Sequence, residues 1–496
     1  MNDPEWTVAG LGRALRSGAL SSVEIVRRLL DGADARDEVL GVYLARFDDE
    51  AVAAAQAADA ELAAGVDRGP LHGIPLGIKD LITTREGPTT AQSSVDHPWR
   101  GVRSDADVIT SLRAAGAVVL GKVSTMEFGV GGPIGQLGFR TPRNPWNTDH
   151  WTGGSSSGTG SGVAAGFFPA GLGTDTAGSI RGPAAYCGVT GLKPTYGLVP
   201  VAGCVPLAPG YDTVGPMART AEDCALVLDA LTSGRRHADL TGMLSGVTVG
   251  VDALVGRGTT ASPTTLEAFA AAVDVLRAAG AVVRQVEVPW FEELTTTTVL
   301  GYLAEGFVEH QEGLRREWGA YAPQTRTALL TGALISAEER ARLEEVRRAG
   351  REAMSTLFRE VDLVVTPTTA GAAPAITDLP SLRTIDALYT PVWNATGQPA
   401  LSVPMGFSET GLPLGLQIVG RHHAEAAVLN AGHAFQTRTD WHLRAPVAPP
   451  EETVRSLLAA AGLSEMSAAE VRTAAARLPG LRDRIAKAYN AVSPPV

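Results

Sequence analysis

The chain has 496 residues, of which 45% are hydrophobic and 19% are charged. These values are ordinary for a folded globular protein, so they exclude a fibrous protein and a chain dominated by disordered tails. The formal net charge is −11 at pH 7, whereas a protein that binds nucleic acid non-specifically is usually basic. We therefore expect an enzyme-sized protein that does not bind nucleic acid directly.

The N-terminus and the hydropathy pattern predict neither secretion nor membrane insertion. Residues 1–6 lack both the basic region and the apolar region of a secretory signal. No segment approaches the roughly 20 consecutive apolar residues that a bilayer-spanning helix needs. We expect a cytoplasmic protein without a membrane partner.

Cysteine and histidine spacing gives no support for a metal site. Cys187, Cys204 and Cys224 form no C-x-x-C pair, and no H-E-x-x-H spacing occurs. Residues 116–122 resemble the start of a phosphate-binding loop, but Val123 stands where Ser or Thr is required. We therefore predict cysteines that only pack, and neither a metal nor another cofactor.

The first 68 residues are predicted to form a helical layer that does not carry the site. Helices are expected over 6–17, from Ser21 onward, and over 48–64. Ser21 is followed three residues later by Glu24, which is the pattern of a capping box, and then by the apolar residues Ile25 and Leu29.

From residue 69 to residue 445, short apolar runs alternate with helical patterns. Val/Ile/Leu-rich strands that alternate with helices favour an α/β fold. We predict one large mixed β-sheet sandwiched between helical layers. The expected strands are 74–82, 117–120, 170–174, 247–251, 281–288, 361–366 and 414–419, and the expected helices include 106–115 and 263–279.

A Pro-rich break at 445–450 separates the last residues from this core. Residues 451–496 show apolar spacings such as Val454, Leu457, Leu458 and Ala461, which indicate short amphipathic helices. We predict a helical C-terminal extension.

Residues 129–215 are rich in Gly, Ser, Thr and Pro, a composition that a linker also has. Apolar residues such as Val163 and Phe167 interleave with the glycines, which favours tightly folded backbone beside a ligand. Small residues precede Ser179, so several backbone N–H groups can converge on a developing oxyanion. Because no G-x-S-x-G elbow occurs, a Ser-His-Asp hydrolase is disfavoured.

Several motifs together resemble the amidase signature family. The resemblance covers about residues 5–445 and is carried by GIPLGIKD at 73–80, TPRNPW at 141–146, GGSSSGTGSG at 153–162, GLGTDTAGSIRGP at 171–183, CGVTGLKPTYGLVP at 187–200, DTVGP at 212–216 and NATGQPALSVP at 394–404.

The resemblance implies a Ser-Ser-Lys catalytic set made of Lys79, Ser155 and Ser179. Ser179 is then the nucleophile, Ser155 the proton relay and Lys79 the general base. The implied oxyanion hole consists of backbone N–H groups of Thr176, Ala177, Gly178 and Ser179. Many family members have glycine where this chain has Ala177, and alanine is tolerated there if its φ is negative.

The implied activity is hydrolysis of a carboxamide in a small-molecule substrate to a carboxylate and ammonia or an amine, through an acyl-enzyme. Lys79 must be neutral to accept a proton, and burial can lower a lysine pKa by up to 3–5 units. The apolar run 74–78 before Lys79 is consistent with such burial.

Further expectations are less specific. Arg181 and Asp212 occupy motif positions and are read as a pair that orients the site, or equally as a structural ion pair. Residues 292–342, with Tyr302, His310, Trp318 and Tyr321, are expected to help shape the acyl pocket. The resemblance makes a homodimer plausible.

Three other functions remain open at this point. The chain resembles the amidase (glutaminase) subunit of a glutamine-dependent amidotransferase, although those subunits tend to have glutamine where Gly182 stands. It also resembles hydrolases of the same family that act on carbamate or ureido groups. A catalytically inactive scaffold or binding subunit is the alternative of another class, and the presence of all three catalytic residues argues against it.

Overall fold

The computed structural model describes residues 6–132, 138–232, 236–258, 260–381 and 384–446. The predicted extension at 451–496 lies outside these residues, and the predicted domain boundaries remain predictions. No helix in the described ranges combines the length and apolar character that crossing a membrane requires.

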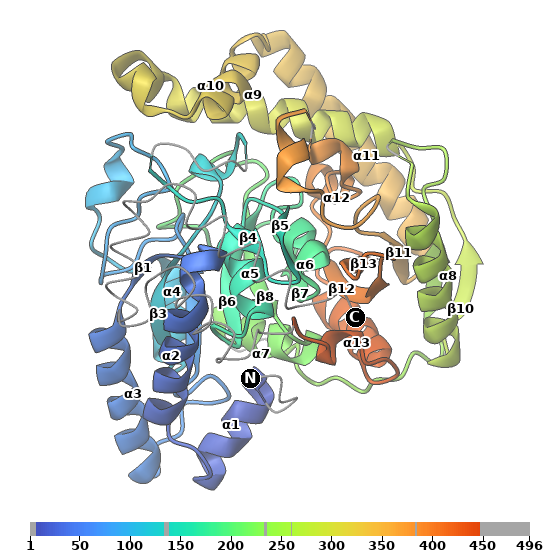
Figure 1. The fold of residues 1–496 in the computed structure, drawn as a ribbon. Helices are drawn as coiled ribbons and strands as arrows, with labels where there is room; N and C mark the ends of the chain where they lie inside the picture. The colour runs from blue at the N-terminus through green and yellow to red at the C-terminus, as the bar shows by residue number, and fades with distance from the viewer. Residues whose placement is uncertain (1–5, 133–137, 233–235, 259, 382–383, 447–496) are drawn as a thin grey trace.

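A mixed sheet runs through the molecule, with helices on both sides (Figure 1), as the sequence predicted. Its strand order is β1-β3-β2-β6-β8-β7-β12-β13-β11-β9-β10. The bounds are β1 (Tyr43–Arg46), β2 (Pro75–Lys79), β3 (Val118–Val123), β6 (Ala170–Asp175), β7 (Thr190–Lys193), β8 (Thr213–Ala218), β9 (Thr248–Val251), β10 (Val282–Gln285), β11 (Leu363–Pro367), β12 (Ala400–Phe407) and β13 (Pro413–Gly420).

Parallel and antiparallel pairs are both present in this sheet. Strand β2 is parallel to β3 and β6, and β9 is parallel to β10 and β11, while the central strands from β6 to β11 pair antiparallel. A separate small sheet pairs β4 (Arg143–Asn144) with β5 (Asn147–Trp151).

The helices form layers around the sheet. Helix α2 begins with the predicted capping box, because Ser21 Oγ accepts the N–H of Glu24 and the Glu24 carboxylate accepts the N–H of Ser21. The bounds are α1 (Val8–Ser17), α2 (Ser22–Leu40), α3 (Asp48–Ala63), α4 (Asp107–Ala114), α5 (Ser157–Ala164), α6 (Arg181–Cys187), α7 (Ala221–Leu231), α8 (Pro263–Ala278), α9 (Phe291–Glu317), α10 (Pro323–Ala333), α11 (Ala337–Glu360), α12 (Val392–Thr396) and α13 (Glu425–Gln436).

Strand β13 shows how the sheet separates two helical layers. A Cβ added at Gly415 would lie 2.6 Å from Ala185 of α6. A Cβ added at Gly420, five residues further along the strand, would instead lie 2.8 Å from Val428 of α13. Because successive strand residues point to opposite faces, α6 and α13 cover opposite faces of the sheet.

Helices α5 and α6 lie in the interior of the molecule. Every residue of both helices is buried, and α5 consists mainly of Gly, Ser and Ala. A Cβ at Gly162 would lie 2.2 Å from the Phe168 ring, and one at Gly160 would lie 3.1 Å from Pro183 of α6. The glycines therefore let α5 pack against the sheet and α6, which holds the loops at either end of these helices close together.

Candidate active site

Lys79 is the last residue of β2, and its side chain is fully buried. Strand β2 is parallel to β6, with Ile78 opposite Leu172, so the carboxyl ends of the two strands lie side by side. Lys79 Nζ donates hydrogen bonds to Thr174 Oγ1 of β6 at 2.8 Å and to Ser155 Oγ at 2.7 Å. The structure thus joins two of the predicted catalytic residues directly.

Ser156 also contacts Lys79, a role that the sequence did not reveal. Ser156 Oγ lies 3.0 Å from Lys79 Nζ, donates to the Thr174 carbonyl at 3.1 Å, and accepts the Thr174 N–H at 3.2 Å. Hydroxyl groups both accept and donate, so Ser156 can hold either protonation state of the amine. The run of three serines at 155–157 was the only local signal in the sequence.

Burial lowers the pKa of Lys79 to about 7, although the carboxylates of Asp175 and Asp212 oppose this shift. Desolvation disfavours the charged form of an amine, and carboxylates favour it. The direction agrees with the sequence-based expectation. Burial therefore favours the neutral amine that a general base requires.

The loop that carries Ser155 depends on two glycines. A Cβ at Gly153 would lie 2.8 Å from Pro183, and one at Gly154 would lie 2.3 Å from Met126 Sδ. Gly153 also has a positive φ of 80°. The peptide between Gly154 and Ser155 is cis.

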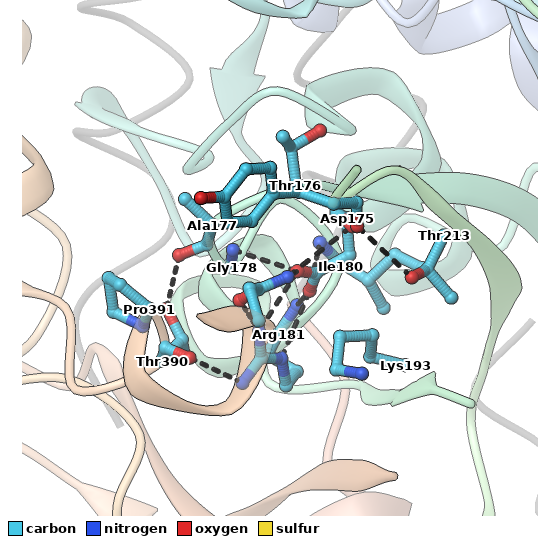
Figure 2. A network of polar contacts seen from close by, with 12 residues as sticks. Asp175, Thr176, Ala177, Gly178, Ile180, Arg181, Lys193, Thr213, Thr390 and Pro391 are labelled. Carbon is cyan, nitrogen blue, oxygen red and sulfur yellow. Dashed lines mark hydrogen bonds and ion pairs between the residues drawn. The ribbon is translucent and has the colours of Figure 1, made fainter. Parts of the chain in front are cut away.

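The turn at 176–179 is fixed from both sides. The Asp175 carboxylate accepts the N–H of Gly178 at 2.8 Å, and the Thr390 hydroxyl donates to the Ala177 carbonyl at 2.7 Å (Figure 2). Gly178 has a φ of +130°, and a Cβ there would lie 2.0 Å from Thr390 Oγ1. Ala177 is not among the residues of positive φ, so its backbone tolerates the side chain.

The oxyanion hole remains a prediction, and these contacts distinguish its candidate donors. The N–H of Gly178 is engaged by Asp175, so it shapes the turn. Within the described residues, the N–H groups of Ala177 and Ser179 donate no hydrogen bond. Those two groups are therefore free to act as donors in the turn.

The predicted pairing of Arg181 with Asp212 is wrong. Arg181 instead forms a buried two-point ion pair with Asp175, at 2.9 and 3.0 Å. Its guanidinium also donates to Thr390 O, Gln417 Oε1 and Asn394 Oδ1 (Figure 2 shows the Arg181 contacts with Asp175 and Thr390). Burial alone would raise the pKa of Asp175, but the guanidinium holds it well below its usual range.

Asp212 serves a different part of the site. Its Oδ1 accepts the Thr176 hydroxyl at 2.6 Å, and its Oδ2 accepts the N–H groups of Leu207 and Ala208 at 2.9 and 3.0 Å. Burial raises the pKa of Asp212 to about 6. Asp212 therefore ties the turn to the loop at 207–208.

Ser155, Ser179, Thr176 and Ala177 line one cavity of about 80 Å³, whereas Gly178 is not part of its wall. Tyr302 of α9 reaches this cavity, but His310 and Tyr321 pack against Phe128 instead. The remaining wall is formed by Met126, Gly129, Val130, Gly131, Trp151, Gly154, Leu207, Thr384, Ile385 and Leu388.

Comparison with known proteins agrees with these motifs. The family model described as Amidase matches residues 24–429, which include all three predicted catalytic residues. The chain belongs to the amidase signature family. It is 38% identical over 489 residues to the A subunit of glutamyl-tRNA(Gln) amidotransferase from Roseiflexus sp. (strain RS-1), covering 90% of this chain and 99% of the relative.

Solved structures of amidase signature enzymes are also similar. The native peptide amidase from Stenotrophomonas maltophilia aligns with a TM-score of 0.73 and 30% identity, over 90% of this chain and 99% of that chain. A bacterial aryl acylamidase of the amidase signature family aligns with a TM-score of 0.79 and 25% identity, over 89% of this chain and 99% of that chain. The protein is thus an amidase signature enzyme in sequence and in fold.

Proposed function

We propose that the chain hydrolyses the carboxamide bond of a small molecule through an acyl-enzyme on Ser179. The observation that supports this most is the 2.7 Å contact between Lys79 Nζ and Ser155 Oγ, because it couples a buried amine to a hydroxyl in the same cavity as Ser179. A nucleophilic serine needs a base, and no histidine lines this cavity among the described residues.

The proposed reaction moves protons along this line of groups. Neutral Lys79 takes a proton from Ser155, which takes one from Ser179 as Ser179 Oγ attacks the carbonyl carbon. The N–H groups of Ala177 and Ser179 stabilise the oxyanion. The C–N bond then breaks, its electron pair stays on nitrogen, and Ser155 returns a proton to the leaving amine. Water cleaves the acyl-enzyme by the same steps.

The cavity favours an uncharged acyl group. Its described wall contains Met126, Val130, Trp151 and Leu388 but no charged side chain. A buried charge without a partner is costly, so an apolar or aromatic acyl group fits this wall better than a charged one.

A second candidate is favoured by the curated relatives. They are named as the A subunit of glutamyl-tRNA(Gln) amidotransferase, and the identity of 38% extends over nearly the whole relative. In that case the amide would be that of glutamine, and the chain would act as the glutaminase subunit beside other subunits. The charged groups of glutamine would then need partners beyond the described cavity wall.

A substrate panel separates these candidates. Purified protein is assayed with aryl, aliphatic, ureido and carbamate substrates and with glutamine, each with Ser179→Ala as the control. Turnover of simple amides supports the first candidate, and turnover of glutamine alone supports the second. Preference for a carbamate or ureide would assign the chain to that branch of the family.

Labelling tests the alternative of an inactive scaffold. A fluorophosphonate probe should modify the wild-type protein at Ser179 and leave Ser179→Ala unlabelled, as read by peptide mass spectrometry. Labelling that persists in the Ser179→Ala protein, or no labelling of a folded wild-type protein, would contradict the proposed nucleophile.

A further inference from the structure

A second cavity of about 210 Å³ lies next to the first. It is mainly apolar in character, with one carboxylate, that of Asp212. The cavity is lined by Leu81, Trp99, Gly129, Thr174, Thr176, Val201, Ala202, Gly203, Cys204, Val205, Pro206, Leu207, Pro209, Asp212, Thr213 and Val214. None of the steps proposed above places a group in it.

The two cavities share part of their walls, namely Gly129, Thr176 and Leu207. Gly129 has no side chain on this shared wall. A Cβ added there would lie 3.5 Å from Ser155 Oγ, 3.3 Å from Leu81 and 3.7 Å from Leu207. A side chain at Gly129 would therefore contact both the Ser155 hydroxyl and the two leucines that border the second cavity.

The position of Ser155 gives this shared wall a role in the reaction, provided that the proposed function holds. Ser155 returns the proton to the departing nitrogen, so that nitrogen must lie within hydrogen-bond distance of Ser155 Oγ when the C–N bond breaks. We propose that the second cavity binds the amine half of the substrate, and that this half is an amine carrying an apolar substituent.

The size of the cavity favours a substituted amine over ammonia. One water, which is close to ammonia in size, needs a cavity of only about 10–15 Å³, far less than the volume of the second cavity. The side chains of Leu81, Val205 and Val214 suit an alkyl or aryl substituent. After the C–N bond breaks, the neutral amine is left beside these side chains while the acyl group stays on Ser179.

The outer rim of the second cavity offers an exit for the released amine. Val201, Ala202 and Pro209 line the cavity and are themselves exposed at the surface. An amine that gains a proton on its way out would pass the Asp212 carboxylate, which attracts a cation. The amine can thus leave while the acyl group still fills the front cavity.

Partition of the acyl-enzyme between water and added amines tests this inference. An activated ester generates the acyl-enzyme, and hydroxylamine or benzylamine then competes with water for it. Aminolysis reverses the acylation step, so the attacking amine must occupy the site from which the leaving amine departs. The ratio of amide to acid formed does not depend on how much of the protein is active.

Two variants narrow the second cavity, Ala202→Trp at its exposed rim and Val205→Phe inside it. We expect the ratio of benzylamide to hydroxamate formed to fall by about tenfold or more in both, because a hydrophobic pocket discriminates by about this factor for small changes in fit. Val308→Phe, on the exposed face of α9 away from both cavities, is the matched control and should keep the wild-type ratio.

An unchanged ratio in both cavity variants would overturn the inference, as would a wild-type protein that accepts hydroxylamine but not benzylamine. Mass spectrometry of the acyl-enzyme separates this outcome from failure of the proposed function. If an acyl group is trapped on Ser179 and the ratio does not change, only the second-cavity inference fails. If Ser179→Ala still turns over the ester, the proposed function fails.

Discussion

Two buried lysines on adjacent strands show how the fold separates a reactive amine from a structural one. Lys122 of β3 lies opposite Ile78, the neighbour of Lys79, and both amines are almost fully buried. Lys122 Nζ lies 3.0 Å from the Asp80 carboxylate and donates to Thr89 Oγ1 at 2.7 Å. Lys79 has hydroxyl partners, and no carboxylate of the described residues lies within ion-pair distance of it.

The two lysines differ in the effect that loss of the amine's positive charge has on their partners. A neutral Lys122 would leave the buried Asp80 carboxylate without its counter-charge, whereas a neutral Lys79 keeps its hydrogen bonds to Ser155, Ser156 and Thr174. Burial lowers the pKa of both lysines, but only Lys79, which lacks a carboxylate partner among the described residues, suits proton transfer. Substitutions at the two positions should therefore have different consequences.

The largest expected effect is that of Lys79→Met on turnover. Removing the base should lower kcat on the order of 10⁴-fold or more, as loss of one member of a hydrolase catalytic set does. The variant should remain folded, as judged by circular dichroism. A decrease in kcat of less than tenfold would contradict the role of Lys79.

Lys122→Met should instead act on stability. Breaking a buried ion pair leaves Asp80 uncompensated, and we expect the free energy of unfolding to fall by about 3–5 kcal/mol. Urea denaturation measures this loss. The double variant Lys122→Met/Asp80→Leu should recover part of the lost stability. If Lys122→Met alone is as stable as the wild type, the ion pair does not stabilise the fold.

Thr176→Val tests the contact between the turn and Asp212. It removes the 2.6 Å hydrogen bond to Asp212 and leaves a buried carboxylate less satisfied, a change of about 1–3 kcal/mol. We expect kcat to fall more than KM rises, because the turn that carries the oxyanion donors loosens. Thr176→Ser keeps the hydroxyl and should restore kcat. An equal decrease of kcat in Thr176→Ser and Thr176→Val would indicate a packing effect alone.

The smallest expected effect is a shift of the pH profile in Asp212→Asn. The Asp212 carboxylate raises the pKa of Lys79, so its removal should lower that pKa further. The rise of kcat with pH should then occur at lower pH than in the wild type. Steady-state kinetics between about pH 5 and pH 9 measure this shift, because this range extends to both sides of the lowered pKa of Lys79. A shift to higher pH would contradict the coupling.

The sequence predicted much of the fold but only part of the sheet. The strand at β6 and the capping box of α2 follow from local patterns that the structure keeps. Strands β7, β8 and β12 were missed; each contains Gly or Pro, residues that usually weaken a strand, although β2 and β6 contain them as well. Gly215 is required there, since a Cβ would lie 2.1 Å from the Leu192 carbonyl of the neighbouring strand.

Family motifs predicted residues of the candidate site one at a time, and the catalytic roles of these residues remain predictions. Motifs located Lys79, Ser155 and Ser179, and parallel strand ends explain why Lys79 meets Thr174. Partner choice was not predictable, because Asp175 and Asp212 are both acidic residues of conspicuous motifs, and only the turn geometry assigns Arg181 to Asp175. Contacts made across the chain, such as that of Arg181 with Gln417, leave no local signal.

The most direct test of a neutral Lys79 is the pH dependence of fluorophosphonate labelling at Ser179, which requires no knowledge of the substrate. Because the pKa of Lys79 is lowered to about 7, the labelling rate should rise with pH and reach half of its maximum near pH 7. Lys193 is a useful control, since burial also lowers its pKa to about 7 but its amine donates to the Pro194 carbonyl. The profile should persist in Lys193→Met and vanish in Lys79→Met. A flat profile, or a midpoint near the ordinary lysine pKa of about 10.4, would contradict the account.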